Sequence, residues 1–220
     1  ASNTTADVLR PAFQIVKTAP GISLVSAYFA MIVPDCPYPN LAPEEEKGFF
    51  LYADSGGVPD PSAEELADIA ITTCETIENI FNAKKAYAAM LSYSTKGSAK
   101  HPRIDKVIKA TKIANEKRPD LAIDGELQGD SAIVERVGKK KAPGSTVAGR
   151  ANCLIFPDLD SGNINYKLTQ YLGKAEAYGP LLQGLDKPIN DLSRGSSAED
   201  IVNVAAIVAV KAMVPYGKRD

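Results

Sequence analysis

The hydrophobic pattern alternates between short apolar runs and longer stretches with apolar residues at helical spacing. The apolar runs predict strands at residues 22–33, 49–54, 86–93, 121–127, 152–156 and 177–182. The other stretches predict helices at residues 4–18, 62–80, 102–117, 132–138, 164–172 and 196–214. Strands that alternate with helices of this length imply right-handed βαβ crossovers. The predicted class is therefore α/β, with a largely parallel sheet covered by helices on both faces.

The last predicted helix has the clearest start. Ser196 with Glu199, or Ser197 with Asp200, fits the capping box that opens a helix, and the spacing leaves both registers open. Apolar residues then recur at helical spacing, which predicts one buried face. This face is expected to contain Ile201, Val204, Ala205, Val208 and Ala212.

The loop that leads into this helix carries candidate chemistry. A helix start has free backbone N–H groups and the positive end of the helix dipole, so it can bind an anion. Arg194 adds a planar cation suited to phosphate or carboxylate, and Ser193 adds a hydroxyl donor. Asp200, with Glu199, could accept a proton. Ordinary capping and a solvated arginine explain the same spacing, so the spacing alone does not decide between these interpretations.

Polar loops follow several of the predicted strands. Ligands of open α/β sheets bind at the carboxyl ends of strands, and the loops at residues 92–98, 124–128, 157–163 and 187–197 are expected to share that edge. Within residues 94–98, Lys96 and backbone N–H groups could hold a phosphate, although an ordinary flexible loop fits equally well. Neither G-x-G-x-x-G nor the P-loop motif occurs in the chain.

The charge balance gives no indication of a nucleic-acid partner. Lys and Arg number 25 against 27 Asp and Glu, for a net charge of −2. The largest basic cluster, residues 139–141, is predicted to be a solvated loop. No apolar run approaches the ~18 residues that a membrane-spanning helix needs. We therefore expect a globular protein that contacts neither nucleic acid nor membrane.

The cysteines and the histidine exclude several kinds of site. The three cysteines are far apart and form no C-x-x-C, and His101 is the only histidine in the chain. A disulfide framework and a zinc site are therefore not supported, and a reducing cytoplasm is expected. The neighbours of His101 suggest no nucleophile, so His101 is expected to lie in a loop. We predict no bound metal.

Seven short blocks, spread over nearly the whole chain, carry a family resemblance. They are TTADxLRPAxQI at 4–15, LSYSTKGS at 91–98, DGELQ at 124–128, LIFPDL at 154–159, GNIxYKL at 162–168, EAYGP at 176–180 and NDLSRG at 190–195. In sequence and order these blocks resemble the phosphate acetyltransferase and phosphate butyryltransferase family.

The resemblance implies a fold of two α/β domains similar to isocitrate dehydrogenase. It implies transfer of an acetyl group between acetyl phosphate and coenzyme A in a ternary complex, by direct thiolate attack. Coenzyme A would be a substrate and not a permanently bound cofactor, and the enzyme would be a homodimer. Asp200 would be the base for the thiol, Arg194 would hold phosphoryl or carbonyl oxygens, and Ser193 would be a supporting donor. Arg10 would line the same cleft, and Thr5 is a further candidate for substrate binding. Weaker candidates are Ser94, Lys96, Asn163 and Tyr178.

The chain departs from the family pattern in two ways. Ser196 stands where the family commonly has cysteine, so a thiol nucleophile is not expected there. The chain also starts where about a third of the family's length should have passed. We therefore expect residues 1–18 and 190–220 to be the remnant of a first domain, and residues 19–189 to form the second. Alternatives are a phosphate butyryltransferase, the acyltransferase part of a larger polypeptide, and an inactive fragment that serves as a dimerising module.

Overall fold

The described part of the chain is built around one six-stranded sheet. The computed structural model describes residues 11, 13–38, 48–192 and 196–214. The strands are β1 (Ser26–Ile32), β2 (Phe49–Ala53), β3 (Tyr87–Leu91), β4 (Ala122–Leu127), β5 (Cys153–Ile155) and β6 (Glu176–Gln183). The helices are α2 (Ala63–Asn79), α3 (Pro102–Lys117), α4 (Gly129–Ile133), α5 (Glu135–Lys141), α6 (Leu159–Leu172) and α7 (Ala198–Met213).

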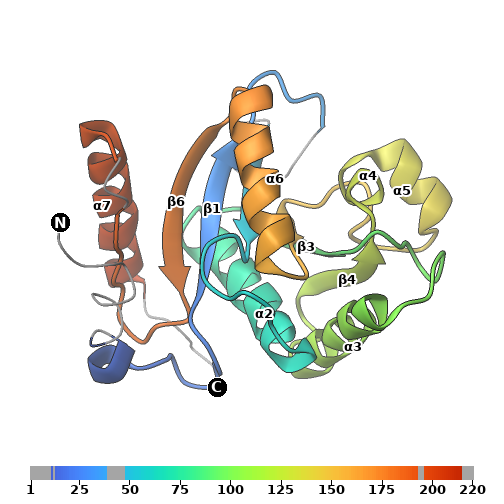
Figure 1. Ribbon diagram of the computed structural model, residues 1–220, viewed down its shortest axis with the longest axis horizontal. Helices are drawn as coiled ribbons and strands as arrows, with labels where there is room; N and C mark the ends of the chain where they lie inside the picture. Colours follow the sequence, from blue (N-terminus) through green and yellow to red (C-terminus); the bar gives the residue numbers. More distant parts are fainter. Residues whose placement is uncertain (1–10, 12, 39–47, 193–195, 215–220) are drawn as a thin grey trace.

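The strands lie in the order β4-β3-β5-β2-β1-β6 (Figure 1). The pairs β4–β3, β3–β5 and β5–β2 are parallel. The strand β1 is antiparallel to both of its neighbours, β2 and β6, so β6 runs in the same direction as β2. Among these six strands only β1 is reversed, which confirms the prediction of a largely parallel α/β sheet.

Helices cover both faces of the sheet, as predicted. On one face, Tyr28 of β1 packs in a core with Leu66 of α2, Val107 of α3 and Val204 of α7. The next residue, Phe29, faces the opposite side, because successive strand residues point to opposite faces. There it stacks on Tyr166 of α6, with ring centroids 3.9 Å apart, in a second core that also contains residues of α4. Two hydrophobic layers therefore hold the strands that end at the loops described below.

Several predicted boundaries shift. The strand predicted at 22–33 is shorter, and the helix predicted at 164–172 begins earlier, at Leu159, because the Asp158 carboxylate accepts a 2.8 Å hydrogen bond from the Ser161 N–H and caps it. The helix predicted at 132–138 is two short helices, α4 and α5.

A basic cluster and a histidine that the sequence placed in loops belong to a helix and to a helix cap. The basic residues 139–141 form the last turn of α5, where lysines interact favourably with the helix dipole, so the loop prediction was wrong. His101 is the N-cap of α3, and its Nδ1 accepts a 3.2 Å hydrogen bond from the Arg103 N–H.

The start of α7 is as predicted, but its buried face is not. Ser197 and Asp200 form the capping box, which settles the register that the sequence left open. Val204 and Lys211 are buried, and Ile207 and Val208 pack partly against the core. Ile201, Ala205 and Ala212 are exposed, so this part of the prediction was wrong. Because α7 is apolar on most sides, residue spacing does not show which narrow stripe contacts the sheet.

Candidate functional site

The first turn of α7 is close enough to Tyr178 of β6 for its carboxylates to act on the Tyr178 hydroxyl through their charge. The Tyr178 hydroxyl donates a hydrogen bond to the Glu176 carboxylate. This bond, together with partial burial and the negative charges of Glu176, Glu199 and Asp200, raises the pKa of Tyr178 to about 12. At neutral pH the side chain is therefore a neutral phenol that can donate a proton to a hydrogen bond. Two of the predicted site residues, Tyr178 and Asp200, lie close enough for their charges to interact.

The Asp200 carboxylate takes part in the helix cap. Its Oδ2 accepts a 2.8 Å hydrogen bond from the Ser197 N–H, and its own N–H donates to Ser197 Oγ over 3.1 Å. The backbone N–H of Ser197, and then its side chain, hold the pKa of Asp200 below its ordinary value. The carboxylate is ionised at neutral pH, as a proton acceptor must be. Its role as a base stays a prediction.

The other catalytic candidates, Ser193 and Arg194, lie outside the described residues, as do Thr5 and Arg10. The segment that leads to Ser193 is fixed on β6 by Asn190. The Asn190 Oδ1 accepts a 2.8 Å hydrogen bond from the Leu182 N–H, and its Nδ2 donates to the Pro180 carbonyl over 2.9 Å. The loop before α7 therefore starts from a fixed point on the sheet.

The direction of α7 along β6 contradicts the prediction that the loop at residues 187–197 lies at the carboxyl edge of the sheet. Lys211, near the end of α7, donates to the carbonyl of Leu182, at the carboxyl end of β6, whereas Asp200 lies near Tyr178 in the first half of that strand. The helix therefore runs back along β6, and the start of α7 is not at the carboxyl edge of the sheet. The prediction that residues 187–197 share that edge with the other loops was wrong for Ser197.

Ser94 and Lys96 have partners within the chain. The Ser94 hydroxyl and the Gly97 N–H donate to Glu126 Oε1, over 2.9 and 2.7 Å, and the Glu126 side chain is buried. Lys96 Nζ lies 2.5 Å from Asp124 Oδ1 and 2.7 Å from the Gly125 carbonyl. The donors expected to hold a phosphate thus face carboxylates of their own chain. Substrate binding by Ser94 and Lys96 stays a prediction.

Asn163 lies on α6 and contacts the loop after β2. Its Nδ2 donates to the Ser55 carbonyl over 3.4 Å. The preceding Gly162 lets the helix approach that loop closely, because a Cβ at this position would lie 2.1 Å from the Asp54 carbonyl oxygen. Part of the family-like block at 162–168 therefore fixes α6 against the sheet.

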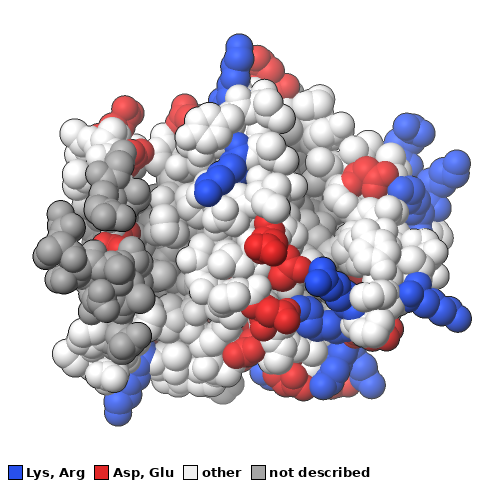
Figure 2. All heavy atoms as spheres, in the orientation of Figure 1, with Lys and Arg blue, Asp and Glu red and all other residues white. Residues whose placement is uncertain are grey.

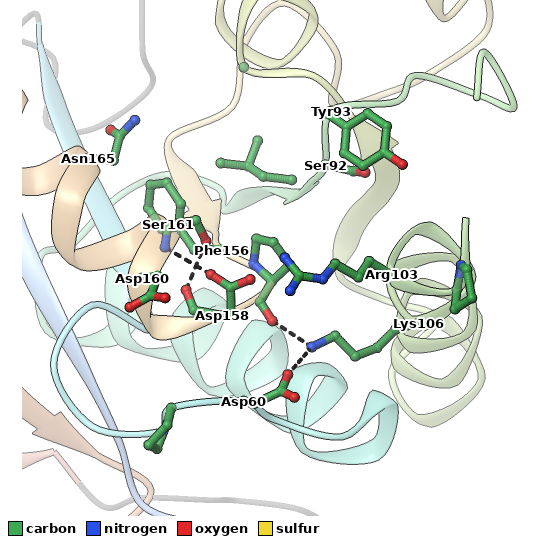
Figure 3. A pocket seen from close by; sticks show the side chains of 15 residues that line it. Asp60, Ser92, Tyr93, Arg103, Lys106, Phe156, Asp158, Asp160, Ser161 and Asn165 are labelled. Atoms are coloured by element: carbon green, nitrogen blue, oxygen red, sulfur yellow. Dashed lines mark hydrogen bonds and ion pairs between the residues drawn. The ribbon is translucent and has the colours of Figure 1, made fainter. Parts of the chain in front are cut away.

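A cavity of about 860 Å³ opens at the carboxyl ends of β2, β3 and β5 (Figure 3). It is lined by Pro59, Asp60, Leu91, Ser92, Tyr93, Pro102, Arg103, Lys106, Gly129, Phe156, Pro157, Asp158, Asp160, Ser161 and Asn165. Residues from the loops at 92–98 and 157–163 meet here, which confirms that these two loops share one edge. Sequence reasoning missed Arg103 and Lys106. The available signal was their position in the first two turns of a helix that begins at Pro102, directly after a polar loop.

The charges around the cavity are partly paired. Lys106 Nζ lies 2.6 Å from Asp60 Oδ1 and donates to the Pro157 carbonyl over 2.8 Å. The hydrogen bond and charge of Lys106, with a smaller effect of Arg103, hold the pKa of Asp60 below its ordinary value. Figure 2 shows acidic and basic side chains next to one another on this face, around the lower end of α6 and along α3.

The described residues offer no group of three or more His, Cys, Asp or Glu side chains arranged to hold a metal ion. Over the same part of the chain, every helix is either too short or too polar to cross a lipid bilayer.

Comparison with known proteins supports the resemblance seen in the sequence. Residues 1–209 match the phosphate acetyl/butaryl transferase family. The phosphate acetyltransferase of Acetivibrio thermocellus is 61% identical over 212 residues, which cover 96% of this chain and 62% of that protein. The phosphate acetyltransferase of Clostridium acetobutylicum is 57% identical, again over 96% of this chain and 62% of the relative.

A crystal structure of a phosphotransacetylase from Streptococcus pyogenes has the same fold, with a TM-score of 0.87 and 52% identity. The alignment covers 97% of this chain and 61% of that one. This chain thus spans 62% of the length of each of these two curated relatives. On the family match, the sequence identities and the shared fold, the chain belongs to the phosphate acetyl/butaryl transferase family.

Proposed function

We propose that this protein transfers an acetyl group between acetyl phosphate and coenzyme A. The observation that carries the proposal is the 61% identity, over 96% of this chain, to a protein named phosphate acetyltransferase. The geometry at the start of α7 is compatible with this activity, because the ionised Asp200 carboxylate lies in its first turn and acts through its charge on the Tyr178 phenol.

In the proposed reaction, Arg194 holds the phosphoryl oxygens of acetyl phosphate and Ser193 donates a further hydrogen bond. Asp200 accepts the proton of the coenzyme A thiol, and the thiolate attacks the acyl carbon. A carbon–sulfur bond forms, the bond from carbon to the bridging oxygen breaks, and phosphate leaves with that electron pair. Both substrates are present together, and no acyl group is attached to the enzyme.

The basicity of Asp200 supplies little of the driving force for removing the thiol proton of coenzyme A. A thiol of pKa 8.5 that loses its proton to an aspartate of pKa 3.9 faces an uphill step of roughly 6 kcal/mol. The capping hydrogen bonds lower the pKa of Asp200 and make this gap larger. The positive end of α7 and the Arg194 guanidinium must therefore stabilise the thiolate and the developing oxyanion as the proton moves.

Coenzyme A acts here as a substrate and not as a resident cofactor. The remaining candidates for substrate binding are Thr5, Arg10, Ser94, Lys96, Asn163 and Tyr178. The position of Tyr178 beside Asp200 supports its candidacy most directly. Ser94 and Lys96 would first have to release Glu126 and Asp124.

We also infer that the protein is a homodimer and works in the cytoplasm. Exposed apolar side chains lie on one face of α6 and offer a surface for a second copy. They are Ile164, Leu168, Tyr171 and Leu172. The three cysteines are free and buried, which fits a reducing compartment.

The division into domains is part of the same proposal. Residues 1–18 and 190–220 belong to a first domain, and residues 19–189 form the second. Support comes from α7, which belongs to the proposed first domain and presents exposed apolar side chains away from the sheet. These side chains, Ile201, Val202, Val210 and Met213, would pack against the rest of the first domain.

The test is the formation of acetyl-CoA from acetyl phosphate and coenzyme A, followed by thioester absorbance. Butyryl phosphate is the second acyl donor, because a phosphate butyryltransferase would prefer it. The proposal expects acetyl transfer well above the uncatalysed rate, without a covalent acetyl-enzyme in rapid-quench samples. A folded chain with no acetyl transfer, or a trapped acetyl-enzyme, would refute the proposed activity or mechanism respectively.

A further inference from the structure

The cavity at the carboxyl edge of the sheet is separate from the start of α7. The walls of the cavity include the first turn of α6. Tyr178 belongs to β6, the strand that follows the last turn of α6, and Asp200 acts on Tyr178 through its charge. The 14 residues of α6 span about 20 Å at 1.5 Å per residue. The cavity therefore lies toward the opposite end of α6 from Tyr178, and the groups that line it have no role in the mechanism above.

Three charged groups of the cavity form hydrogen bonds or ion pairs within the described part of the protein. Two do not: Arg103, which acts on Asp60 only through its charge, and Asp160. Lys106 pairs with Asp60, and the Asp158 carboxylate caps α6. Arg103 and Asp160 form no side-chain hydrogen bond or ion pair with another described residue. In Figure 3, Arg103 extends from α3 toward the side of the cavity that carries Asp158 and Ser161. One cation and one carboxylate are thus left available to a ligand.

Apolar residues form part of the remaining walls. Tyr93 keeps 58% of its surface exposed and presents its ring at the upper side of the cavity. Pro59, Pro102 and Pro157 add rigid apolar surfaces. An aromatic ring beside a groove is a stacking surface for a nucleobase. The volume of about 860 Å³ lies within the range that small-molecule sites have, about 300–1,000 Å³.

We propose that this cavity binds a nucleoside phosphate. The phosphate lies on the Arg103 guanidinium, whose planar fork matches phosphate oxygens. The ribose hydroxyls donate to the Asp160 carboxylate, the group that proteins commonly use for a ribose. The base lies against Tyr93 and the prolines. This site goes beyond the proposed acyl transfer and does not depend on it.

The ligand is a free nucleoside monophosphate and not the nucleotide part of coenzyme A, whose ribose carries a 3′-phosphate where this site places the Asp160 carboxylate. Binding is measured by isothermal titration calorimetry with AMP as the probe, and with adenosine and ribose 5-phosphate as its two fragments. We expect AMP to bind, and each fragment to bind at least about tenfold more weakly, because adenosine lacks the phosphate and ribose 5-phosphate lacks the base. Competition with coenzyme A checks this assignment: continued AMP binding in its presence supports a site for a free nucleotide, whereas displacement of AMP would assign the cavity to the proposed substrate and overturn the proposal.

Substitutions locate the site. Arg103→Gln should weaken AMP binding by about tenfold or more and leave adenosine binding unchanged, because only AMP carries the phosphate. Tyr93→Ala should weaken AMP and adenosine by similar factors. Lys112→Gln is the matched control, since it removes a positive charge from α3 at an exposed position outside the cavity. It should change AMP binding by less than about twofold. The proposal is overturned if AMP fails to bind at millimolar concentration, or if Arg103→Gln and Lys112→Gln have equal effects.

Discussion

Ser197 and Asp200 close a reciprocal pair of hydrogen bonds across the first turn of α7. The Ser197 N–H donates to the Asp200 carboxylate over 2.8 Å, and the Asp200 N–H donates to the Ser197 hydroxyl over 3.1 Å. One carboxylate thus has a structural role in the cap and a proposed role as the proton acceptor in acyl transfer. Two substitutions separate these roles.

Asp200→Asn should abolish the proton acceptor and keep the cap, because the asparagine Oδ1 can still accept from the Ser197 N–H. We expect kcat to fall by about 100-fold or more, with little change in KM for acetyl phosphate and no large change in Tm. Ser197→Ala should do the reverse. It should destabilise the fold by about 1 kcal/mol and leave most of kcat intact. Small and similar effects of the two substitutions on kcat would show that the carboxylate only caps the helix.

The close contact between α6 and the loop after β2 gives a stability prediction. A Cβ on residue 162 would lie 2.1 Å from the Asp54 carbonyl oxygen, which is backbone and cannot turn away. Gly162→Ala should therefore lower the free energy of unfolding by at least about 2 kcal/mol. Gly129→Ala is the control, since its Cβ would meet no atom within 4 Å. Urea denaturation of both variants checks this, and equal stabilities would contradict the packing described here.

Features set by neighbouring residues were predictable from the sequence. The capping box of Ser62 and Glu65 and that of Ser197 and Asp200 involve residues three positions apart, and both form as the spacing indicates. The strands of the central sheet were also recognisable, because strands buried on both faces read as short apolar runs. These features give the α/β class without knowledge of any long-range contact.

Features set by distant contacts were not predictable in this way. Tyr28 and Phe29 are both apolar and face opposite sides of the sheet, as they would in a strand of either direction. The hydrophobic pattern therefore does not show that β1 is antiparallel to its neighbours. The start of α7 lies away from the carboxyl edge because Asn190 binds β6, a contact between a loop and a strand. Arg103 lies in the cavity because α3 packs beside β4; its position at a helix start after a polar loop, which the sequence shows, does not indicate which other loops it meets.

The exposed face of α6 gives a prediction about assembly. Leu168 keeps 52% of its surface exposed and lies on the same side of the helix as Ile164 and Tyr171. Leu168→Lys should convert the proposed dimer to a monomer, because it places a charge in an apolar interface. Ile108→Lys, at an exposed apolar position on α3, is the control and should leave the dimer intact. Sedimentation velocity measures both, and a monomeric parent chain at micromolar concentration would exclude the dimer.

Lys211 gives a prediction about pH. Its side chain is buried between α7 and the sheet, where Nζ donates to the Leu182 carbonyl and lies 5.4 Å from the centre of the Tyr28 ring. Burial lowers the pKa of Lys211 from its ordinary value of 10.5 to about 8. The folded protein therefore releases this proton at a lower pH than the unfolded chain does.

Between pH 8 and 10.5 the unfolded chain holds more protons on this group than the folded protein does, so stability should rise with pH in that window. The full gain attributable to Lys211 is about 3 kcal/mol, and it is absent below pH 8, where both states are protonated. Lys211→Met should remove this gain, and the titration of all other groups is common to both proteins. The difference between the two curves of unfolding free energy against pH, from urea denaturation, isolates the effect. Parallel curves from pH 7 to 10.5 would mean that Lys211 is not desolvated in the folded protein.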